Sequence, residues 1–213
     1  MPAFDFKKEY KELYLPKSKP IIIDVPTMRF IMIDGKGDPN TSEFYKASVE
    51  ILYGLSYSIK MSKKSGNKPE GYFDYVVPPL EGLWWFEEEY FDGNVIGKKD
   101  KFNWTMMIRQ PNFVTQHVFE TAKAVLSKKK PELDTSVAHL EDFTEGLCAQ
   151  VMHIGSYDDE QPTVEALEEF IKSQGYRTEM SGIRQHHEIY ISDPRKTAPE
   201  KLKTVIRHPI LRL

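Results

Sequence analysis

Two residues near the C-terminus have the chemistry and the spacing of a reactive pair. Glu188 and Tyr190 lie two positions apart in the run 186–191, whose alternating side chains are typical of a β-strand. Successive side chains of a strand point to opposite faces, so the carboxylate and the phenol share one face while Ile189 and Ile191 share the other. The polar face is turned either to water or to a cavity. In a cavity, the carboxylate could act as a general base on water and the phenol could hold or polarise a ligand.

Two adjacent tryptophans supply the aromatic surface that such a cavity would need. Trp84 and Trp85 lie in a predicted strand at 80–87 and must point to opposite faces, so one can belong to the core while the other lines an opening. Alternation groups Trp84 with Phe86. We expect Trp84 and Phe86 to line the site, although the sequence leaves open which tryptophan faces inward.

A third tryptophan and a histidine are the remaining candidates for ligand contact. Trp104 lies in the predicted strand 102–109, where ordinary strand packing is the competing explanation. His153 is flanked by apolar residues in the predicted strand 148–155, where a hydrogen-bonded core position is the more common role of a histidine. Aromatic ring faces and a carboxylate together attract flat or cationic organic molecules. On that basis, the predicted ligand-binding set includes Trp104 and His153.

The sequence predicts no metal and no cofactor. His186 and His187 are adjacent on a strand and diverge, so they cannot readily share a metal, and neither a CxxC nor an HExxH motif occurs. The glycine pair in the run 35–39 is followed by aspartate and proline, which does not suit a phosphate-binding loop. No serine has the surroundings of a nucleophile elbow.

Composition disfavours several classes of protein. The 213 residues are 40% hydrophobic, enough for a real core, and their formal net charge of −3 gives no basic field for nucleic acid. No apolar run is long enough to span a membrane, and the N-terminus has no signal-peptide pattern. The single cysteine, Cys148, suits a reducing compartment. We therefore expect a cytoplasmic protein that binds small molecules, with no nucleic acid or membrane contact and no indicated protein partner.

The elements that must position these residues form an α+β pattern that occurs twice. Strand, glycine, acidic turn, proline and helix follow one another in each half of the chain. This weak duplication predicts two strand-helix-strand-strand repeats in one domain, 1–213. The first repeat is expected at about 21–92, an insert at about 93–145 and the second repeat at about 146–213.

Each predicted repeat has a late strand that carries candidate site residues, 83–87 in the first half and 187–191 in the second. Packed about a pseudo-twofold axis, these strands would face a ligand cleft between the halves, with tryptophan from one side and the carboxylate and phenol from the other. The chain is expected to close with a short helix from a capping box at 197–200 through Ile206.

The C-terminal run 188–204 closely resembles the GyrI-like small-molecule-binding family. Supporting matches occur at 82–85, 104–108 and 149–160, so the resemblance covers nearly the whole chain. The C-terminal signature is long and specific, and the other matches are supportive.

The resemblance implies a tandem strand-helix-strand-strand fold with a cleft between its halves, as in the effector-binding domains of multidrug-responsive regulators. In those domains a glutamate at the position that matches Glu188 reads cationic aromatic ligands. Standalone members lack a DNA-binding segment, and some hydrolyse the strained cyclopropane of yatakemycin-type DNA alkylators inside an aromatic cage. Here Trp84, Trp104, Glu188 and Tyr190 could supply such a cage.

The combined prediction is a domain that binds flat hydrophobic or cationic xenobiotics and hydrolyses them as a cyclopropanoid cyclopropyl hydrolase would, giving cellular protection. Glu188 would orient or activate water, Tyr190 would hydrogen-bond the ligand, and Trp84 and Trp104 would sandwich it. One alternative is a non-catalytic sequestering or sensing protein that uses the same residues. The other is a gyrase-inhibitor-like protein that binds a protein partner, which would need an exposed apolar or acidic patch.

Overall fold

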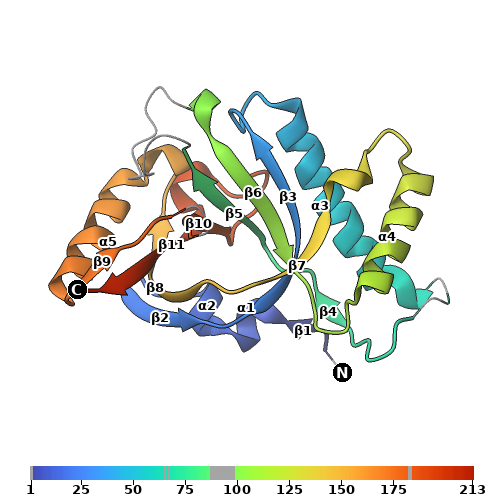
Figure 1. Ribbon diagram of the computed structural model, residues 1–213, viewed down its shortest axis with the longest axis horizontal. Coiled ribbons are helices and arrows are strands. Elements are labelled where there is room, and N and C mark those ends of the chain that lie inside the picture. Colours follow the sequence, from blue (N-terminus) through green and yellow to red (C-terminus); the bar gives the residue numbers. More distant parts are fainter. Residues whose placement is uncertain (1, 65, 67, 87–98, 182–183) are drawn as a thin grey trace.

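The computed structural model describes residues 2–64, 66, 68–86, 99–181 and 184–213. Figure 1 shows a broad, curved sheet with helices packed at its two ends. Within the described residues, no helix is both long and apolar enough to cross a membrane.

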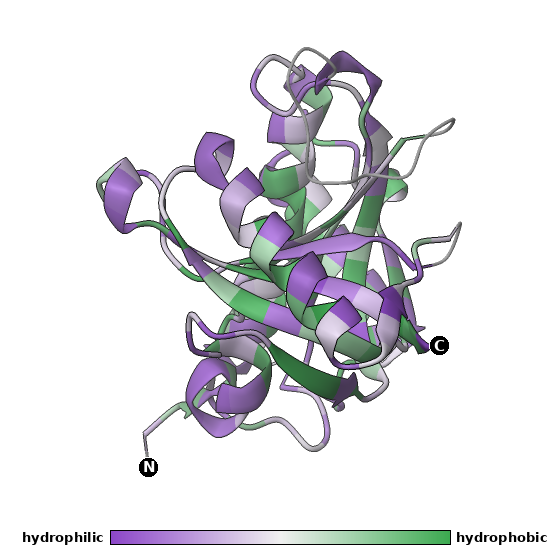
Figure 2. Ribbon diagram, turned by 90° about the vertical axis from the view of Figure 1, so that its left-hand side faces the viewer, coloured by the Kyte–Doolittle hydropathy of each residue, from purple (hydrophilic) through white to green (hydrophobic). Residues whose placement is uncertain are grey.

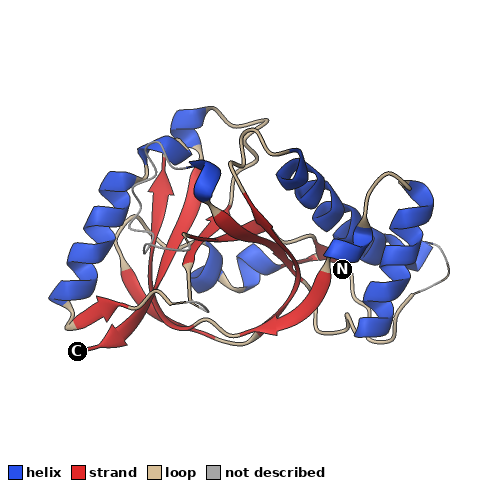
Figure 3. Ribbon diagram, turned by 45° about the horizontal axis from the view of Figure 1, so that its top comes forward, coloured by secondary structure: helices blue, strands red, loops and turns tan. Residues whose placement is uncertain are grey.

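One antiparallel sheet of nine described strands forms the centre of the molecule (Figure 3). The strands are β2 (Ile21–Val25), β3 (Met28–Lys36), β5 (Leu80–Trp85), β6 (Asn103–Arg109), β7 (His139–Phe143), β8 (Gly146–Ile154), β9 (Tyr176–Thr178), β10 (His186–Tyr190) and β11 (Lys203–Arg212). They lie in the order β2-β8-β11-β10-β5-β6-β3-β7, and β9 pairs with β11. A separate parallel pair joins β1 (Phe4–Asp5) to β4 (Tyr75–Val76).

The strand order is symmetrical about the β10–β5 pair. Read outward, β10, β11 and β8 mirror β5, β6 and β3. The repeated unit is therefore strand, helix, strand, strand, which confirms the α+β tandem fold. β6 lies in the segment predicted as an insert, yet it pairs with both β5 and β3 and is the fourth element of the first unit.

Helices cover both faces of the sheet. The longer ones, α3, α4 and α5, lie on one face, and the N-terminal helices α1 and α2 pack on the other. The helices are α1 (Phe6–Glu9), α2 (Lys11–Tyr14), α3 (Glu43–Met61), α4 (Gln116–Lys129) and α5 (Gln161–Ser173). Short 3-10 turns occur at Ser62–Lys64, Lys99–Lys101, Thr135–Val137, Tyr157–Asp159 and Pro199–Lys201.

Hydroxyl side chains fix the starts of α3 and α4. The Ser42 hydroxyl accepts a hydrogen bond from the backbone N–H of Tyr45 and caps α3, which begins at Glu43. The Thr115 hydroxyl caps α4 in the same way by accepting from the backbone N–H of Val118.

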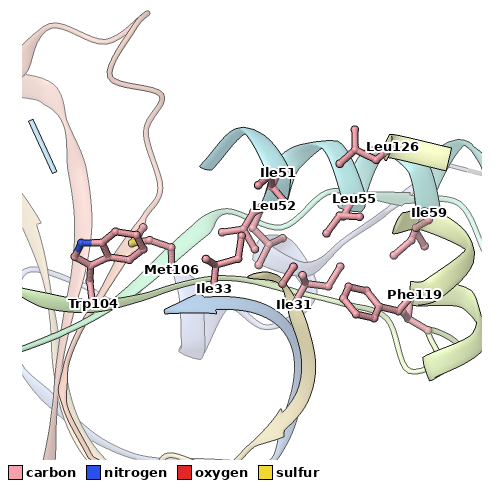
Figure 4. Packing of buried hydrophobic residues seen from close by; sticks show 14 of the residues in the cluster. Ile31, Ile33, Ile51, Leu52, Leu55, Ile59, Trp104, Met106, Phe119 and Leu126 are labelled. Atoms are coloured by element: carbon pink, nitrogen blue, oxygen red, sulfur yellow. The ribbon is translucent and has the colours of Figure 1, made fainter. Parts of the chain in front are cut away.

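The main core lies between the sheet and the pair α3 and α4 (Figure 4). Ile31 and Ile33 point from β3 toward this layer and meet Leu52 and Leu55 of α3, all of them buried. Figure 2 shows hydrophobic residues along the strands, whereas the helices alternate hydrophobic and hydrophilic positions. A half-buried helix needs only one apolar stripe, while strands covered on both faces read as nearly continuous apolar runs.

The predicted C-terminal helix is wrong. Residues 203–212 form the strand β11, and only the 3-10 turn Pro199–Lys201 precedes it in place of the predicted helix through Ile206. Leu202, Val205 and Ile206 mimic a helical face because β11 is a central strand, buried on both sides between β8 and β10.

A buried ionic cluster lies under the N-terminal helices, on the sheet face opposite α3 and α5. The His187 ring lies between two carboxylates, with Nδ1 3.0 Å from Glu145 Oε1 and Nε2 3.1 Å from Glu81 Oε2. The second of these contacts is ionic and lacks hydrogen-bond alignment. Arg207 Nη1 donates to Glu145 Oε2 at 2.7 Å, and Arg207 Nε donates to Gln150 Oε1 at 2.9 Å. Buried charges persist only when paired in this manner.

The cluster shifts the proton affinities of its members. Burial alone would lower the pKa of His187, but the adjacent Glu145 and Glu81 raise it to about 8. Burial would raise the pKa of Glu145, but His187 and Arg207 hold it at about 2. At neutral pH the cluster therefore contains a charged imidazolium between carboxylates.

We expect His187 to make stability depend on pH. Its folded pKa lies above the unfolded value of about 6.5, so its stabilisation is present below that value and is lost as pH rises through about 8. Its contribution to the free energy of unfolding should fall by about 1.5 kcal/mol between about pH 6.5 and 8.5. Urea unfolding at both pH values measures this decline, which His187→Gln should lack. The exposed His117→Gln control should keep it, and equal slopes in all three proteins would contradict the assignment.

Candidate functional site

A cleft of about 1440 Å³ opens on the sheet face that α3, α4 and α5 cover. It is floored by β5 and β10 and walled by α3 and by the turn that leads into α5. Its lining is rich in aromatic side chains and carries both acidic and basic ones. Among the described lining residues are Tyr45, Tyr53, Trp84, Phe102, Tyr157, Glu160, Glu188 and Tyr190.

The pairing of β10 with β5 positions the floor of the cleft. Glu188 lies opposite Gly82, and Tyr190 and Trp84 meet above that glycine, where Trp84 Nε1 donates to the Tyr190 hydroxyl at 3.1 Å. A Cβ on Gly82 would lie 2.8 Å from Trp84 Nε1 and 3.2 Å from the Tyr190 oxygen. Only glycine at this position leaves room for the hydrogen bond.

Glu188 has a second carboxylate and an imidazole beside it. Donor atoms of Glu160, His186 and Glu188 all lie within 4.8 Å of one another. Burial and the neighbouring Glu188 raise the pKa of Glu160 well above its usual value, which favours its neutral acid form. Glu160 Oε1 is buried and has no hydrogen-bond partner among the described residues. A proton donor and a carboxylate acceptor thus lie side by side in the cleft.

His186 lies under this pair and is fully buried. Its Nε2 is 3.2 Å from Glu188 Oε1, and its Nδ1 is 2.8 Å from His208 Nε2. Burial lowers the pKa of His186 to about 4, although the contact with Glu188 acts to raise it. The ring is therefore neutral at pH 7.

Two carboxylates and an imidazole are also donors that suit a divalent cation. The contact between His186 Nε2 and Glu188 Oε1 has the length of a hydrogen bond, so a shared proton accounts for it. We therefore assign the three residues to proton chemistry, and the absence of a metal stays a prediction.

The phenols of the cleft remain protonated donors. Burial, with the nearby Glu188 carboxylate as the next cause, raises the pKa of Tyr157 to about 12 and raises those of Tyr45 and Tyr190 as well. The rings pack edge to face and tilted: Tyr157 and Tyr190 have centroids 5.6 Å apart, and Tyr45 and Trp84 have centroids 6.1 Å apart. The wall therefore presents both ring surface and hydroxyl donors.

The structure brings together three of the six predicted site residues. Glu188, Tyr190 and Trp84 line the cleft, and Trp84 is the tryptophan that faces it. Phe86 is not among the lining residues and stacks on Phe102, which is, with centroids 4.9 Å apart.

Trp104 and His153 lie outside the lining. The Trp104 ring is fully buried over Gly35, where a Cβ would come within 2.2 Å of it, and it stacks on Phe44. His153 Nδ1 contacts the Thr163 hydroxyl at 2.8 Å, and its Nε2 contacts the Ser156 carbonyl at 3.0 Å. These two contacts hold the turn that carries Tyr157 and Glu160 in place.

The sequence did not identify several residues that line the cleft. Glu160 belongs to a run of acidic turn residues that reads as solvent-exposed, and Tyr45 belongs to the first turns of α3. The only signal for Glu160 is its place immediately before the proline-containing helix start of the second repeat.

Gly82→Ala should disrupt the floor of the cleft, because its methyl group would displace Trp84 and Tyr190. We expect a loss of about 1–3 kcal/mol in unfolding free energy and a shifted Trp84 indole N–H signal in NMR spectra. Tyr190→Phe is the matched control, since it removes the hydrogen-bond acceptor without a collision. It should shift the indole signal with a smaller loss of stability, and an unchanged signal in Gly82→Ala would contradict the close approach.

Several solved structures resemble this chain in fold, and some of them also in sequence. The sequence profile of the GyrI-like small molecule binding domain matches residues 18–211. A conserved, uncharacterized protein from Listeria innocua is 49% identical, with a TM-score of 0.93 over 98% of this chain and 100% of its own. A hydrolase encoded by lin2189 from the same organism is 48% identical, with a TM-score of 0.89 over 99% of this chain and 100% of its own.

More distant similarity extends to a different kind of protein. The C-terminal domain of EcmrR is 12% identical with a TM-score of 0.58, covering 92% of this chain and 98% of its own, which shows a shared fold alone. The search of curated proteins found no match. The profile match and the Listeria proteins show that this chain belongs to the GyrI-like small-molecule-binding domain family.

Proposed function

We propose that the cleft binds flat hydrophobic or cationic xenobiotics and hydrolyses those with a strained ring, of which the cyclopropane of yatakemycin-type DNA alkylators is the specific candidate. The observation that carries the proposal is the position of Glu188 on the floor of an aromatic cleft, beside Glu160 and Tyr190. The protein would thereby protect the cell from such compounds.

The walls of the cleft suit the proposed ligand class. Ring surfaces of Tyr45, Trp84 and Tyr157 favour flat aromatic molecules, and the acidic floor favours a positive charge. Membership of a small-molecule-binding family and similarity to proteins described as hydrolases support binding and hydrolysis in this cleft.

The proposed reaction adds one water molecule to the strained ring. Glu188 accepts a proton from water as the water oxygen bonds to the cyclopropane carbon. The carbon–carbon bond breaks, and its electron pair moves through the conjugated ring to the carbonyl oxygen. That oxygen takes a proton and becomes a phenol. Glu160, whose raised pKa favours the neutral acid, is the nearby group able to supply this proton.

Tyr190 would orient the ligand rather than transfer a proton to water. Its oxygen accepts from Trp84 Nε1, so its own O–H hydrogen must point elsewhere, to Glu188 or to a ligand acceptor. Its raised pKa keeps that hydrogen in place.

The test is incubation of the purified protein with a cyclopropanoid alkylator in the presence of EDTA, with mass spectrometry of the ring-opened product. The wild type should form a product heavier by one water. Glu188→Gln should lower turnover by about 100-fold or more while still binding the compound, because it keeps the side-chain volume without the base. The exposed Glu132→Gln control should match the wild type.

Binding and turnover separate the competing functions. Quenching of tryptophan fluorescence by the alkylator, without product from the wild type, would contradict hydrolysis and leave a sequestering protein. Neither quenching nor product would contradict the proposed ligand class. Product that Glu188→Gln forms at the wild-type rate would contradict the role of the carboxylate.

A further inference from the structure

A continuous line of ionisable side chains leads from the cleft floor to the protein surface. Glu188 Oε1 contacts His186 Nε2 at 3.2 Å, and His186 Nδ1 contacts His208 Nε2 at 2.8 Å. His208 Nδ1 then contacts Glu168 Oε1 at 2.7 Å. Both histidines are buried, whereas the Glu168 side chain on α5 is 28% exposed.

We propose that His186, His208 and Glu168 form a proton-transfer path that connects Glu188 in the cleft with solvent at α5. The residues come from three separate elements, β10, β11 and α5, so the alignment is a property of the tertiary fold. His186 and His208 act through Glu188, and Glu168 is the exit of the path.

The three contacts of the path need one proton more than two neutral imidazoles supply. Three hydrogen bonds join the four side chains, and each needs one proton. Two neutral imidazoles supply only two of them. The third must belong to Glu188, to Glu168 or to a cationic histidine. With both carboxylates ionised and both rings neutral, one contact would set two acceptors against each other.

Four placements of the extra proton satisfy all three contacts: on Glu188, on His186, on His208 or on Glu168. The two that leave His186 neutral and Glu168 ionised differ in the tautomer of His186. With the extra proton on Glu188, His186 carries hydrogen on Nδ1 and donates it to His208. With the extra proton on His208, His186 carries hydrogen on Nε2 and donates it to Glu188. His208 Nδ1 donates to Glu168 in both arrangements. When the proton moves from Glu188 to His208, His186 gains a hydrogen on Nε2 and releases the one on Nδ1.

The surroundings of His186 favour passage of the extra proton through its ring and disfavour a cationic ring that holds the proton. Burial disfavours the cationic form of His186, so the proton passes without resting there. Burial would raise the pKa of Glu168, but His208 and the Thr178 hydroxyl, which donates at 2.6 Å, lower it. Glu168 therefore stays ionised as the anchor of the outer end.

Other charged and titratable groups face both ends of the path. At the cleft end, Glu188 is faced by Glu160 at the start of α5, Tyr45 of α3, Tyr157 of the preceding turn and Tyr190 of its own strand. At the outer end, Lys172 also acts on Glu168 and lowers its pKa.

Such a path matters most when a ligand fills the cleft. A flat ligand over Glu188 would keep water from the carboxylate, so a proton taken up there would need another exit. This use in turnover rests on the proposed function, whereas the path itself is a property of the resting protein. It can be tested without any ligand.

The experiment is a pH titration of the full chain by NMR of its ¹⁵N-labelled imidazoles. Shifts of Nδ1 and Nε2 report which nitrogen carries hydrogen. As pH rises and the path loses its extra proton to solvent, we expect His208 Nδ1 to stay protonated. We expect His186 to change from the Nδ1–H to the Nε2–H tautomer, in which Nε2 donates to Glu188. A path that only braces the fold would keep one fixed His186 tautomer, and that result would overturn the proposal.

Two variants of α5 test the connection to the surface. Glu168→Gln keeps an acceptor for His208 but removes the negative charge, so the path should bind its extra proton more weakly by about tenfold or more. The midpoint of the His186 change should then move to lower pH. Glu165→Gln removes the same charge from an exposed position on α5 and should leave the midpoint in place. Equal midpoints in the two variants would overturn the path.

The outcome is independent of hydrolysis. A coupled His186 tautomer change in a protein that never opens a cyclopropane would leave the path standing and remove the proposed reaction. Turnover of the alkylator with a fixed His186 tautomer would support the proposed reaction and overturn the path.

Discussion

The antiparallel pairing of β5 with β10 is the constraint on which the site depends. It places Glu188 opposite Gly82, a residue without a side chain, at the centre of the sheet where the two repeats meet. The space above the glycine is used by Trp84 and Tyr190, which are hydrogen-bonded to each other beside the carboxylate. A shift of one residue in this register would turn every side chain of β10 to the other face.

The two faces of β10 carry different polar groups, and different helices cover them. His187 faces the N-terminal helices and belongs to a buried ionic cluster in which Glu145 pairs with His187 and with Arg207. His186 and Glu188 face the cleft, where protons can be shared and exchanged. Buried polar groups at a sheet centre must be paired. In this strand, one pairing holds the fold together and the other is open to a ligand.

Sequence patterns predicted the tandem α+β fold and the shared face of Glu188 and Tyr190, because strand alternation is a local property. The same alternation placed Trp84 with Phe86 but could not tell which face of the strand opened into a cleft. Trp104 has the residue type of a ligand contact, yet Gly35 on the neighbouring strand gives its ring a buried position. That arrangement depends on pairing between distant segments.

The line from Glu188 to Glu168 could not have been read from the sequence either. Its members are separated along the chain and meet only through β10, β11 and α5. The helix predicted through Ile206 gave no reason to place His208 beside His186, whereas the strand β11 carries His208 to that position. Apolar spacing alone does not separate a helix from a central strand whose two faces are buried.

The most direct test of the central claim is a single turnover of a cyclopropanoid alkylator in water enriched in oxygen-18. If Glu188 acts as a base on water, the product of the first turnover carries the heavy oxygen at the former cyclopropane carbon. If the carboxylate itself attacks the ring, the first product carries ordinary oxygen and the label enters Glu188. The account predicts the first result, and label in Glu188 or an absence of product would contradict it.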